Sequence, residues 1–356
     1  MTAASGGSAA PRVTVVMPIR NEGAFLARSL GSVLAQDYSP DRLEVIVADG
    51  MSDDGTREAI DELRGRHPNL VRIDNPQRIV ATGLNAAIRR ARGEYVVRVD
   101  GHTEIAPDYV RRCVEALERT GADNAGGRMT AAGTGPFGEA VALATSSPFG
   151  VGGARFHYSE REEWVDTVYL GAWRREVFDR IGVFDEELVR DQDDEFNYRL
   201  RASGGRILLT PAVKSLYTVR ARPARLWRQY FEYGLWKVRV LQKHPRQMQP
   251  RQFVPPAFAA TLAALGVASP FSAAARWGLA GVAGAYAAAN VAAAASVSRR
   301  RPARLPLVSL AFAILHLSYG FGFLTGLVRF SGRWKERGAP RARLRPAGGP
   351  GVEGEP

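Results

Sequence analysis

Four short β-branched runs, separated by segments of helical periodicity, occupy the first hundred residues, and this alternation limits the fold more than any other feature of the chain. The intervening apolar residues repeat at helical spacing, as Leu26, Leu30 and Val33 do. Strands are expected at residues 13–17, 43–48, 70–73 and 95–99. Strands joined in sequence by helices predict an α/β fold, with a mostly parallel central sheet covered by helices on both faces.

Polar side chains follow three of these strands. Asn21 and Glu22 come after the first strand, Asp49 ends the second, and Asp100 follows the fourth. In an open α/β sheet, ligands bind at the carboxyl ends of the strands. The convergence of these groups at one edge of the sheet therefore predicts a binding site.

Asp100 and His102 lie two residues apart, directly after the apolar strand. A carboxylate and an imidazole on one tight turn can hold a divalent metal, Mn2+ or Mg2+, against a phosphate. An isolated Asp-x-His is more often only a polar turn after a strand. The metal interpretation therefore depends on the rest of the sequence.

A second acidic cluster contains Asp191, Asp193, Asp194 and Glu195, four carboxylates within five residues. Acidic residues favour the first turn of a helix, so a solvated helix start explains the cluster as well as a site does. Repulsion among clustered acids raises their pKa, which suits a general base.

The charge distribution favours a membrane partner over nucleic acid. Much of the net charge of +12 comes from residues 201–251 and 329–345, and these basic runs flank long apolar segments. This pattern is typical of a protein held at an anionic membrane surface, and no nucleic-acid partner is expected. The single cysteine, Cys113, excludes an intrachain disulfide and is expected in the core.

The apolar segments 253–272, 277–297 and 305–328 are expected to form about three membrane helices. The second is so rich in alanine that a buried soluble helix competes with a span, and the first begins with two prolines and could only dip into the bilayer. The basic segment before them suits an interfacial helix, but part of it could instead close a substrate cleft. The expected boundaries are a disordered leader at 1–11, an α/β domain at 12–219, a basic amphipathic interfacial segment at 220–251, a membrane region at 252–328 and a disordered basic tail at 329–356.

Three motifs carry a resemblance to a known family. Val-x-Val-x-Met-Pro-Ile-Arg-Asn-Glu begins at Val13, Val-Ile-Val-Ala-Asp-Gly-Met-Ser-Asp-Asp-Gly-Thr begins at Val45, and Ala-Arg-Gly-Glu-Tyr-Val-Val-Arg-Val-Asp-Gly-His begins at Ala91. In this order they resemble glycosyltransferase family 2 over roughly residues 12 to 240. Asp-Gly-His in place of Asp-x-Asp resembles the branch that includes succinoglycan-biosynthesis glucosyltransferases. The resemblance implies the GT-A fold of nucleotide-diphospho-sugar transferases.

The resemblance also implies a function and a set of site residues. The expected enzyme is an inverting glycosyltransferase that moves a sugar from a nucleotide-diphospho-sugar, expected to be a UDP-sugar, to a hydroxyl of a lipid-linked or growing saccharide in cell-surface polysaccharide synthesis. Asp193 aligns with the family's general base, and Asp100 with His102 would meet the diphosphate through a metal. The residues expected at the nucleotide sugar are Pro18, Arg20, Asn21, Glu22, Asp49, Asp54, Asn85 and Asp100, and those expected on the acceptor side are Gly171, Trp173 and Asp194.

Two other functional classes fit less well. A non-catalytic membrane subunit of a polysaccharide assembly complex could have lost metal binding at Asp-Gly-His, but it would have no need of the acidic segment around Asp193. A dehydrogenase is disfavoured because no Gly-x-Gly-x-x-Gly follows the first strand.

The expected location is the inner (plasma) membrane, where other polysaccharide-assembly proteins are possible partners. Nucleotide sugars are made in the cytoplasm, so residues 12–240 are expected on that side. Three spans would then place the basic tail outside, against the tendency of basic segments to remain inside.

Overall fold

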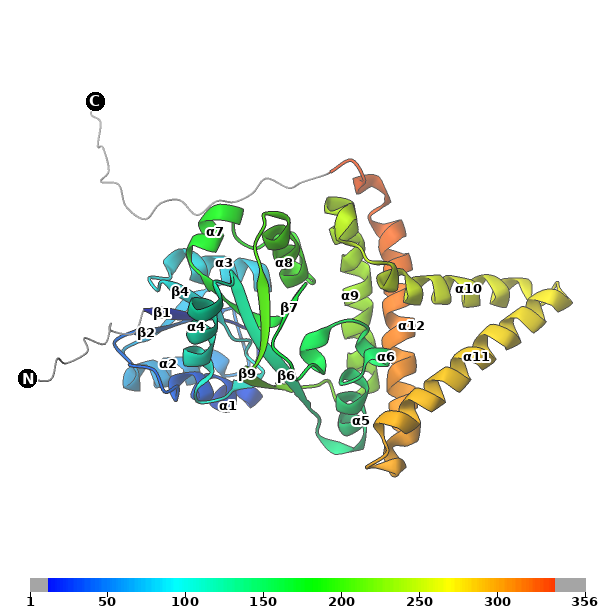
Figure 1. The fold of residues 1–356 in the computed structure, drawn as a ribbon, viewed down its shortest axis with the longest axis horizontal. Coiled ribbons are helices and arrows are strands. Elements are labelled where there is room, and N and C mark those ends of the chain that lie inside the picture. Colours follow the sequence, from blue (N-terminus) through cyan, green and yellow to red (C-terminus); the bar gives the residue numbers. More distant parts are fainter. Residues whose placement is uncertain (1–11, 337–356) are drawn as a thin grey trace, which may run out of the picture.

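The computed structural model describes residues 12–336, and one mixed sheet forms the centre of this part of the chain (Figure 1). The strand order is β3-β2-β1-β4-β8-β6-β9-β5, and β7 pairs with β9. The strands are β1 (Val13–Ile19), β2 (Leu43–Asp49), β3 (Leu70–Asp74), β4 (Tyr95–Arg98), β5 (Thr103–Ile105), β6 (Asn124–Ala132), β7 (Glu163–Val165), β8 (Tyr169–Arg174) and β9 (Ile207–Thr218).

The first four strands are parallel, as their helical connections predict. Four of the eight strand pairings, however, are antiparallel, namely β4–β8, β5–β9, β6–β8 and β7–β9. The expectation of a mostly parallel sheet is therefore wrong. Periodicity locates a strand, but the direction in which the later strands join depends on long connections that periodicity does not describe.

Helices cover both faces of the sheet and continue beyond it. Their bounds are α1 (Gly23–Leu34), α2 (Thr56–Arg66), α3 (Val80–Arg90), α4 (Tyr109–Thr120), α5 (Gly135–Thr145), α6 (Pro148–Val151), α7 (Glu176–Ile181), α8 (Gln192–Ala202), α9 (Pro223–Lys243), α10 (Val254–Ala268), α11 (Ala273–Val297) and α12 (Leu305–Arg329).

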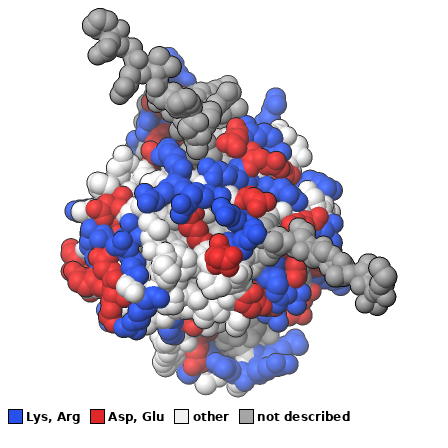
Figure 2. Space-filling view, turned by 90° about the vertical axis from the view of Figure 1, so that its left-hand side faces the viewer, with Lys and Arg blue, Asp and Glu red and all other residues white. Residues whose placement is uncertain are grey.

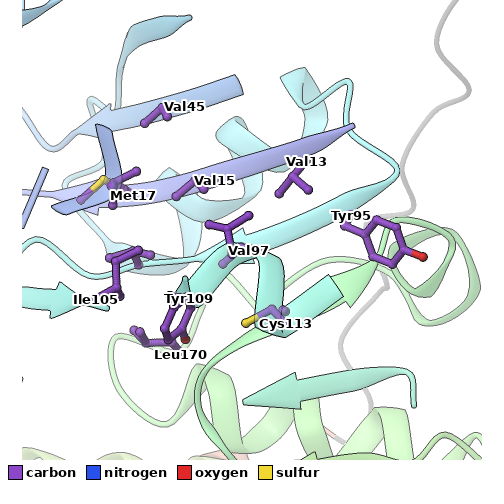
Figure 3. Packing of buried hydrophobic residues seen from close by; sticks show 14 of the residues in the cluster. Val13, Val15, Met17, Val45, Tyr95, Val97, Ile105, Tyr109, Cys113 and Leu170 are labelled. Carbon is purple, nitrogen blue, oxygen red and sulfur yellow. The ribbon is translucent and has the colours of Figure 1, made fainter. Parts of the chain in front are cut away.

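Alternate side chains of β1 divide the core into two layers. Val13 and Val15 pack with α1, α2 and α4. Figure 3 shows part of this layer, which also contains Val97 and Cys113. Val16 belongs to the opposite layer, which contains side chains of α3, α7 and α8. Cys113 is fully buried, as expected, and burial raises the pKa of its thiol.

The helix α9 lies beside α12 at one side of the sheet (Figure 1). Leu235 and Val238 of α9 pack with Phe323 of α12, and a Cβ atom added at Gly322 would lie only 2.1 Å from the carbonyl oxygen of Phe231. The expected interfacial segment is thus a helix, but its second half is buried in the protein instead of lying against lipid.

The helices α10 and α11 form a hairpin that projects away from the rest of the molecule (Figure 1). Within the described residues, two segments, Ala273–Val297 and Pro302–Arg329, are long and apolar enough to cross a membrane. Half of the apolar window of the second segment is buried within the protein, against 11% for the first. With 15 residues, α10 is shorter than a span requires.

The first residues of the expected tail, 329–336, are ordered and contact the α/β domain. Residues 331–333 form a 3-10 turn, and Arg333 lies 2.8 Å from Glu187 in the loop before α8. The expectation of disorder from residue 329 is therefore wrong for 329–336, and the expected three spans with the tail outside stay a prediction. The rest of the tail, and the leader at 1–11, lie outside the described residues.

The close contact of α9 with α12 predicts that a side chain added at this contact destabilises the protein. Gly322→Ala should lower the free energy of unfolding by about 1–3 kcal/mol, because the added methyl group overlaps the Phe231 carbonyl. The matched control is Gly65→Ala in α2, where an added Cβ has no neighbour within 4 Å. The control should leave stability unchanged or raise it by up to about 1 kcal/mol. Thermal unfolding of both detergent-solubilised variants measures the difference, and equal effects would contradict the packing.

Candidate active site

The carboxyl ends of β1, β2 and β4 bring the predicted polar groups together. Glu22 Oε1 lies 3.1 Å from His102 Nδ1, which joins the end of β1 to the turn after β4. Asn21 Nδ2 donates to Asp53 Oδ1 at 2.8 Å, which joins β1 to the loop after β2. Asn21 has a left-handed backbone (φ 53°), a conformation often found in functional sites when a residue other than glycine adopts it.

The loop after β2 is fixed by its own acidic residues. Asp49 is fully buried and accepts hydrogen bonds from Ser52 and from Arg57, the latter at 2.7 Å. Asp54 accepts from the Gly23 amide at 3.1 Å and from Thr56, and these hydrogen bonds, chiefly the one from Thr56, lower its pKa. Asp54 thus holds the loop against the start of α1, and Asp49 ties the loop to α2 through Arg57. The predicted contact of both carboxylates with a nucleotide stays a prediction.

Pro18 and Arg20 lie at the same edge. Pro18 is half-buried near the end of β1, and the exposed Arg20 packs its aliphatic stem against Gly50. Both are therefore placed where a nucleoside would have to bind, if the carboxyl edge of the sheet is the site.

Asp100 forms a two-point ion pair with Arg98, with contacts of 2.7 Å from Nε and 3.1 Å from Nη2. Burial alone raises the pKa of the Asp100 carboxyl, but the Arg98 guanidinium outweighs burial and holds the pKa below its usual range. Arg98 is only 5% exposed, and its Nη1 is buried without a hydrogen-bond partner. Asp100 is therefore a carboxylate at neutral pH, with an unsatisfied donor beside it.

The acidic segment forms the start of α8, and its carboxylates differ in their ion pairing and in their pKa. Asp194 is paired with Lys237, and Glu195 with Arg199 and His244. Asp191 has a left-handed backbone (φ 59°), and burial raises its pKa to about 8 in spite of Lys237.

Asp193 stands apart from the rest of this segment. Its Oδ1 accepts the Asp194 amide at 2.9 Å, and no cation of residues 12–336 lies in hydrogen-bond contact with it. Burial raises the pKa of Asp193, while the nearby charge of Arg98 partly opposes that rise.

The helix α9 supplies the cations that hold this segment in place, a role that the basic run in the sequence does not by itself indicate. Lys237, Arg239 and Lys243 are at most 5% exposed, and they pair with acidic side chains of 185–194. Their charge was attributed to lipid headgroups. The signal was present, because a strongly acidic segment is followed by a strongly basic one, but only the tertiary structure shows which charges meet.

Three predicted residues are placed differently. The Asn85 side chain is buried and exchanges hydrogen bonds with the Phe184 backbone, at 2.8 and 2.9 Å. Trp173 is 2% exposed within an aromatic cluster that includes Phe178. Gly171 (φ 106°) lies beneath Trp173, where a side chain would overlap the indole ring. All three support the fold around the site, and their predicted ligand contacts stay predictions.

The donor set for a metal is small. Within residues 12–336, no group of three or more His, Cys, Asp or Glu side chains could hold a metal ion. Asp100 and His102 nevertheless offer one anionic oxygen group and one imidazole on the same turn, and the nearest charged neighbour of His102 is Glu22. This donor chemistry fits Mn2+ or Mg2+ if substrate oxygens complete the coordination.

A mixed sheet with acidic groups at the carboxyl ends of its parallel strands defines a GT-A-like α/β fold. The family model for glycosyl transferase family 2 matches residues 14–182. The succinoglycan biosynthesis protein ExoA of Rhizobium meliloti is 32% identical over 328 residues, which cover 90% of this chain and 96% of that protein. The chain therefore belongs to glycosyltransferase family 2, and it is a glycosyltransferase.

Solved structures show the same fold. The mannosyltransferase PcManGT from Pyrobaculum calidifontis, solved in complex with GDP-Man and Mn2+, has a TM-score of 0.56 and 24% identity, covering 88% of this chain and 87% of its own. TarS 1–349 of S. aureus, solved in complex with UDP-GlcNAc, has a TM-score of 0.50 and 17% identity, covering 90% of this chain and 92% of its own.

The Arg98–Asp100 ion pair predicts that loss of the Arg98 charge destabilises the protein. Arg98→Met should lower the free energy of unfolding by about 3 kcal/mol, because it leaves the Asp100 carboxylate, whose side chain is 16% exposed, without its partner. The matched control is Arg111→Met, since Arg111 makes ion pairs with Asp37 and Glu115 at the surface, where a pair contributes about 1 kcal/mol or less. Denaturant unfolding of the two variants compares them. A similar small loss in both would show that Arg98 is dispensable.

Proposed function

We propose that this glycosyltransferase is an inverting enzyme that transfers a sugar from a nucleotide-diphospho-sugar, a UDP-sugar by preference, to a hydroxyl of a lipid-linked or growing saccharide. The similarity to a succinoglycan biosynthesis protein along nearly the whole chain supports a role in cell-surface polysaccharide synthesis. The solved relatives with GDP-Man and UDP-GlcNAc support a nucleotide-sugar donor.

The observation that carries the proposal is the state of the carboxylates in the acidic segment. Asp194 and Glu195 are neutralised by cations, and Asp191, with a pKa of about 8, is protonated at neutral pH. A protonated acid cannot accept a proton, and an ion-paired one accepts it poorly. Asp193 is left as the general base, with a raised pKa that suits removal of a proton from an acceptor hydroxyl.

The turn after β4 is proposed to hold the diphosphate end of the donor. Asp100 and His102 would bind a divalent metal, which when bound supplies positive charge for the departing nucleoside diphosphate. Glu22 orients the His102 ring through Nδ1, and Arg98 keeps Asp100 anionic. The acceptor oxygen, deprotonated by Asp193, would attack the anomeric carbon on the face opposite the diphosphate, which inverts the configuration.

The location follows from the substrates and the apolar helices. The apolar helix Ala273–Val297, whose apolar window is only 11% buried, supports membrane association, and a nucleotide sugar supports a cytoplasmic catalytic domain at the inner membrane. A lipid-linked acceptor would then be reached at the membrane surface.

The base assignment is tested by Asp193→Asn. Turnover, read as nucleoside diphosphate released by purified membranes against a panel of nucleotide sugars, should fall by about 10²-fold or more. Binding of UDP or GDP, measured by calorimetry, should be retained, because Asp193 is assigned to the acceptor side. Asp179→Asn, an exposed carboxylate on α7, is the matched control and should keep full turnover. Retained turnover in Asp193→Asn would move the base to a neighbouring acid.

The metal assignment is tested at His102. An imidazole ligand favours later transition metals, so activity with Mn2+ should exceed activity with Mg2+ at equal concentration. His102→Asp should shift that preference towards Mg2+, because the new ligand is a second oxygen. Full activity of the parent enzyme in excess chelator would remove the metal from the mechanism.

A further inference from the structure

The helix α12 is attached to the catalytic domain at both of its ends. Before its first turn, Arg301 and Arg304 contact Glu139 of α5 at 2.9 and 3.1 Å. After its last turn, Arg333 contacts Glu187 at 2.8 Å. The two acidic residues belong to the domain built around one sheet, and both side chains are partly exposed.

These contacts are incompatible with a transmembrane α12. A helix of 25 residues is about 37 Å long, and the hydrocarbon core is about 30 Å thick. A spanning α12 would place Glu139 and Glu187 on opposite sides of the bilayer, with the polar catalytic domain between them. Its length and apolar composition are instead explained by burial, because Gly322 and Gly326 bring it against the α9 backbone and His316 contacts the Phe149 carbonyl at 2.8 Å.

The α10–α11 hairpin has the opposite character. At its tip, Phe271, Trp277 and Val267 are 89%, 79% and 75% exposed, which is costly in water for side chains of this size. Residues 254–298 contain one formal charge, Arg276, and its guanidinium donates to the Ser269 carbonyl at the end of α10.

The distribution of charge indicates which end of the protein faces the membrane. The base of the hairpin carries four arginines within six residues; Arg301 and Arg304 pair with Glu139, and the exposed Arg299 and Arg300 suit anionic headgroups. On the end of the molecule that faces away from the hairpin, acidic and basic side chains are interspersed, as on a surface in water (Figure 2).

We infer that the hairpin inserts into an anionic bilayer from the side of the catalytic domain only, and that α12 lies at the membrane surface as its base without crossing. The inference rests on the proposed membrane association but not on the catalytic roles. The length of α10 limits how deeply the hairpin enters the bilayer. The helix begins beside Gly320 of α12, and its 15 residues extend about 22 Å, so the tip of the hairpin does not reach the opposite surface of the bilayer. Both ends of α12 remain on the cytoplasmic side.

Single cysteines in the full-length chain test the topology with a membrane-impermeant maleimide. The chosen sites are exposed, namely Ala303→Cys before α12, Ser331→Cys after it and Ala274→Cys at the tip; the buried Cys113 is an internal control for the folded state. Inside-out vesicles should label 303 and 331, intact cells should label none, and 274 should react only after detergent is added. Labelling of 331 in intact cells would show that α12 spans, and labelling of 274 there would show that the hairpin crosses. Either result overturns the inference.

A binding assay separates this inference from the proposed enzyme activity. The purified full-length chain should float with vesicles that contain phosphatidylglycerol, and the double variant Phe271→Glu and Trp277→Glu should reduce the bound fraction at least tenfold. Trp164→Glu is the matched control, because Trp164 is 49% exposed on β7, away from the hairpin. Unchanged flotation of the double variant would overturn membrane insertion of the tip, whatever the catalytic assays show.

Discussion

The ion pairs between α9 and the acidic segment 185–195 are the interaction on which the candidate active site depends. A buried charge without a partner costs several kcal/mol, so the carboxylates around Asp193 and the cations of α9 each require the other. Lys237, Arg239 and Lys243 together neutralise side chains on both sides of Asp191. The assigned base therefore keeps its surroundings only while a helix some 40 residues later in the chain remains in place.

The same helix connects the site to the C-terminal third of the chain. Arg239 pairs with Glu187 on one side and with Glu336, beyond α12, on the other. Gln242 donates to the Phe330 carbonyl at 2.7 Å, so the end of α12 is closed against α9. A displacement of α12 by the membrane would thus reach the acidic segment through one layer of side chains. The acidic segment, α9 and the end of α12 are parts of one packed unit.

Local sequence was sufficient for the first four strands and the helices α1 to α4, which follow hydrophobic periodicity, but it did not indicate β5. The groups after β1 and β4 meet as the sheet-edge rule requires, with Glu22 on His102, and their role as a site stays a prediction. The sequence does not show that the Asn85 and Trp173 side chains are buried among protein groups, so their predicted ligand contacts stay predictions. Whether an amide faces a ligand or the Phe184 backbone is decided by residues a hundred positions away.

The third apolar segment shows why the remainder could not be predicted from composition. Hydropathy measures the preference of a segment for apolar surroundings, and lipid and a protein groove satisfy it equally well. The sequence nevertheless contained a conflict, because a span would have placed basic residues on both sides of the membrane, against the positive-inside tendency. The inferred topology avoids this conflict, because the arginines before α12 meet Glu139 and Arg333 after it meets Glu187 on a single domain. A span whose flanking charges violate the expected orientation is therefore better tested first as a helix that does not cross.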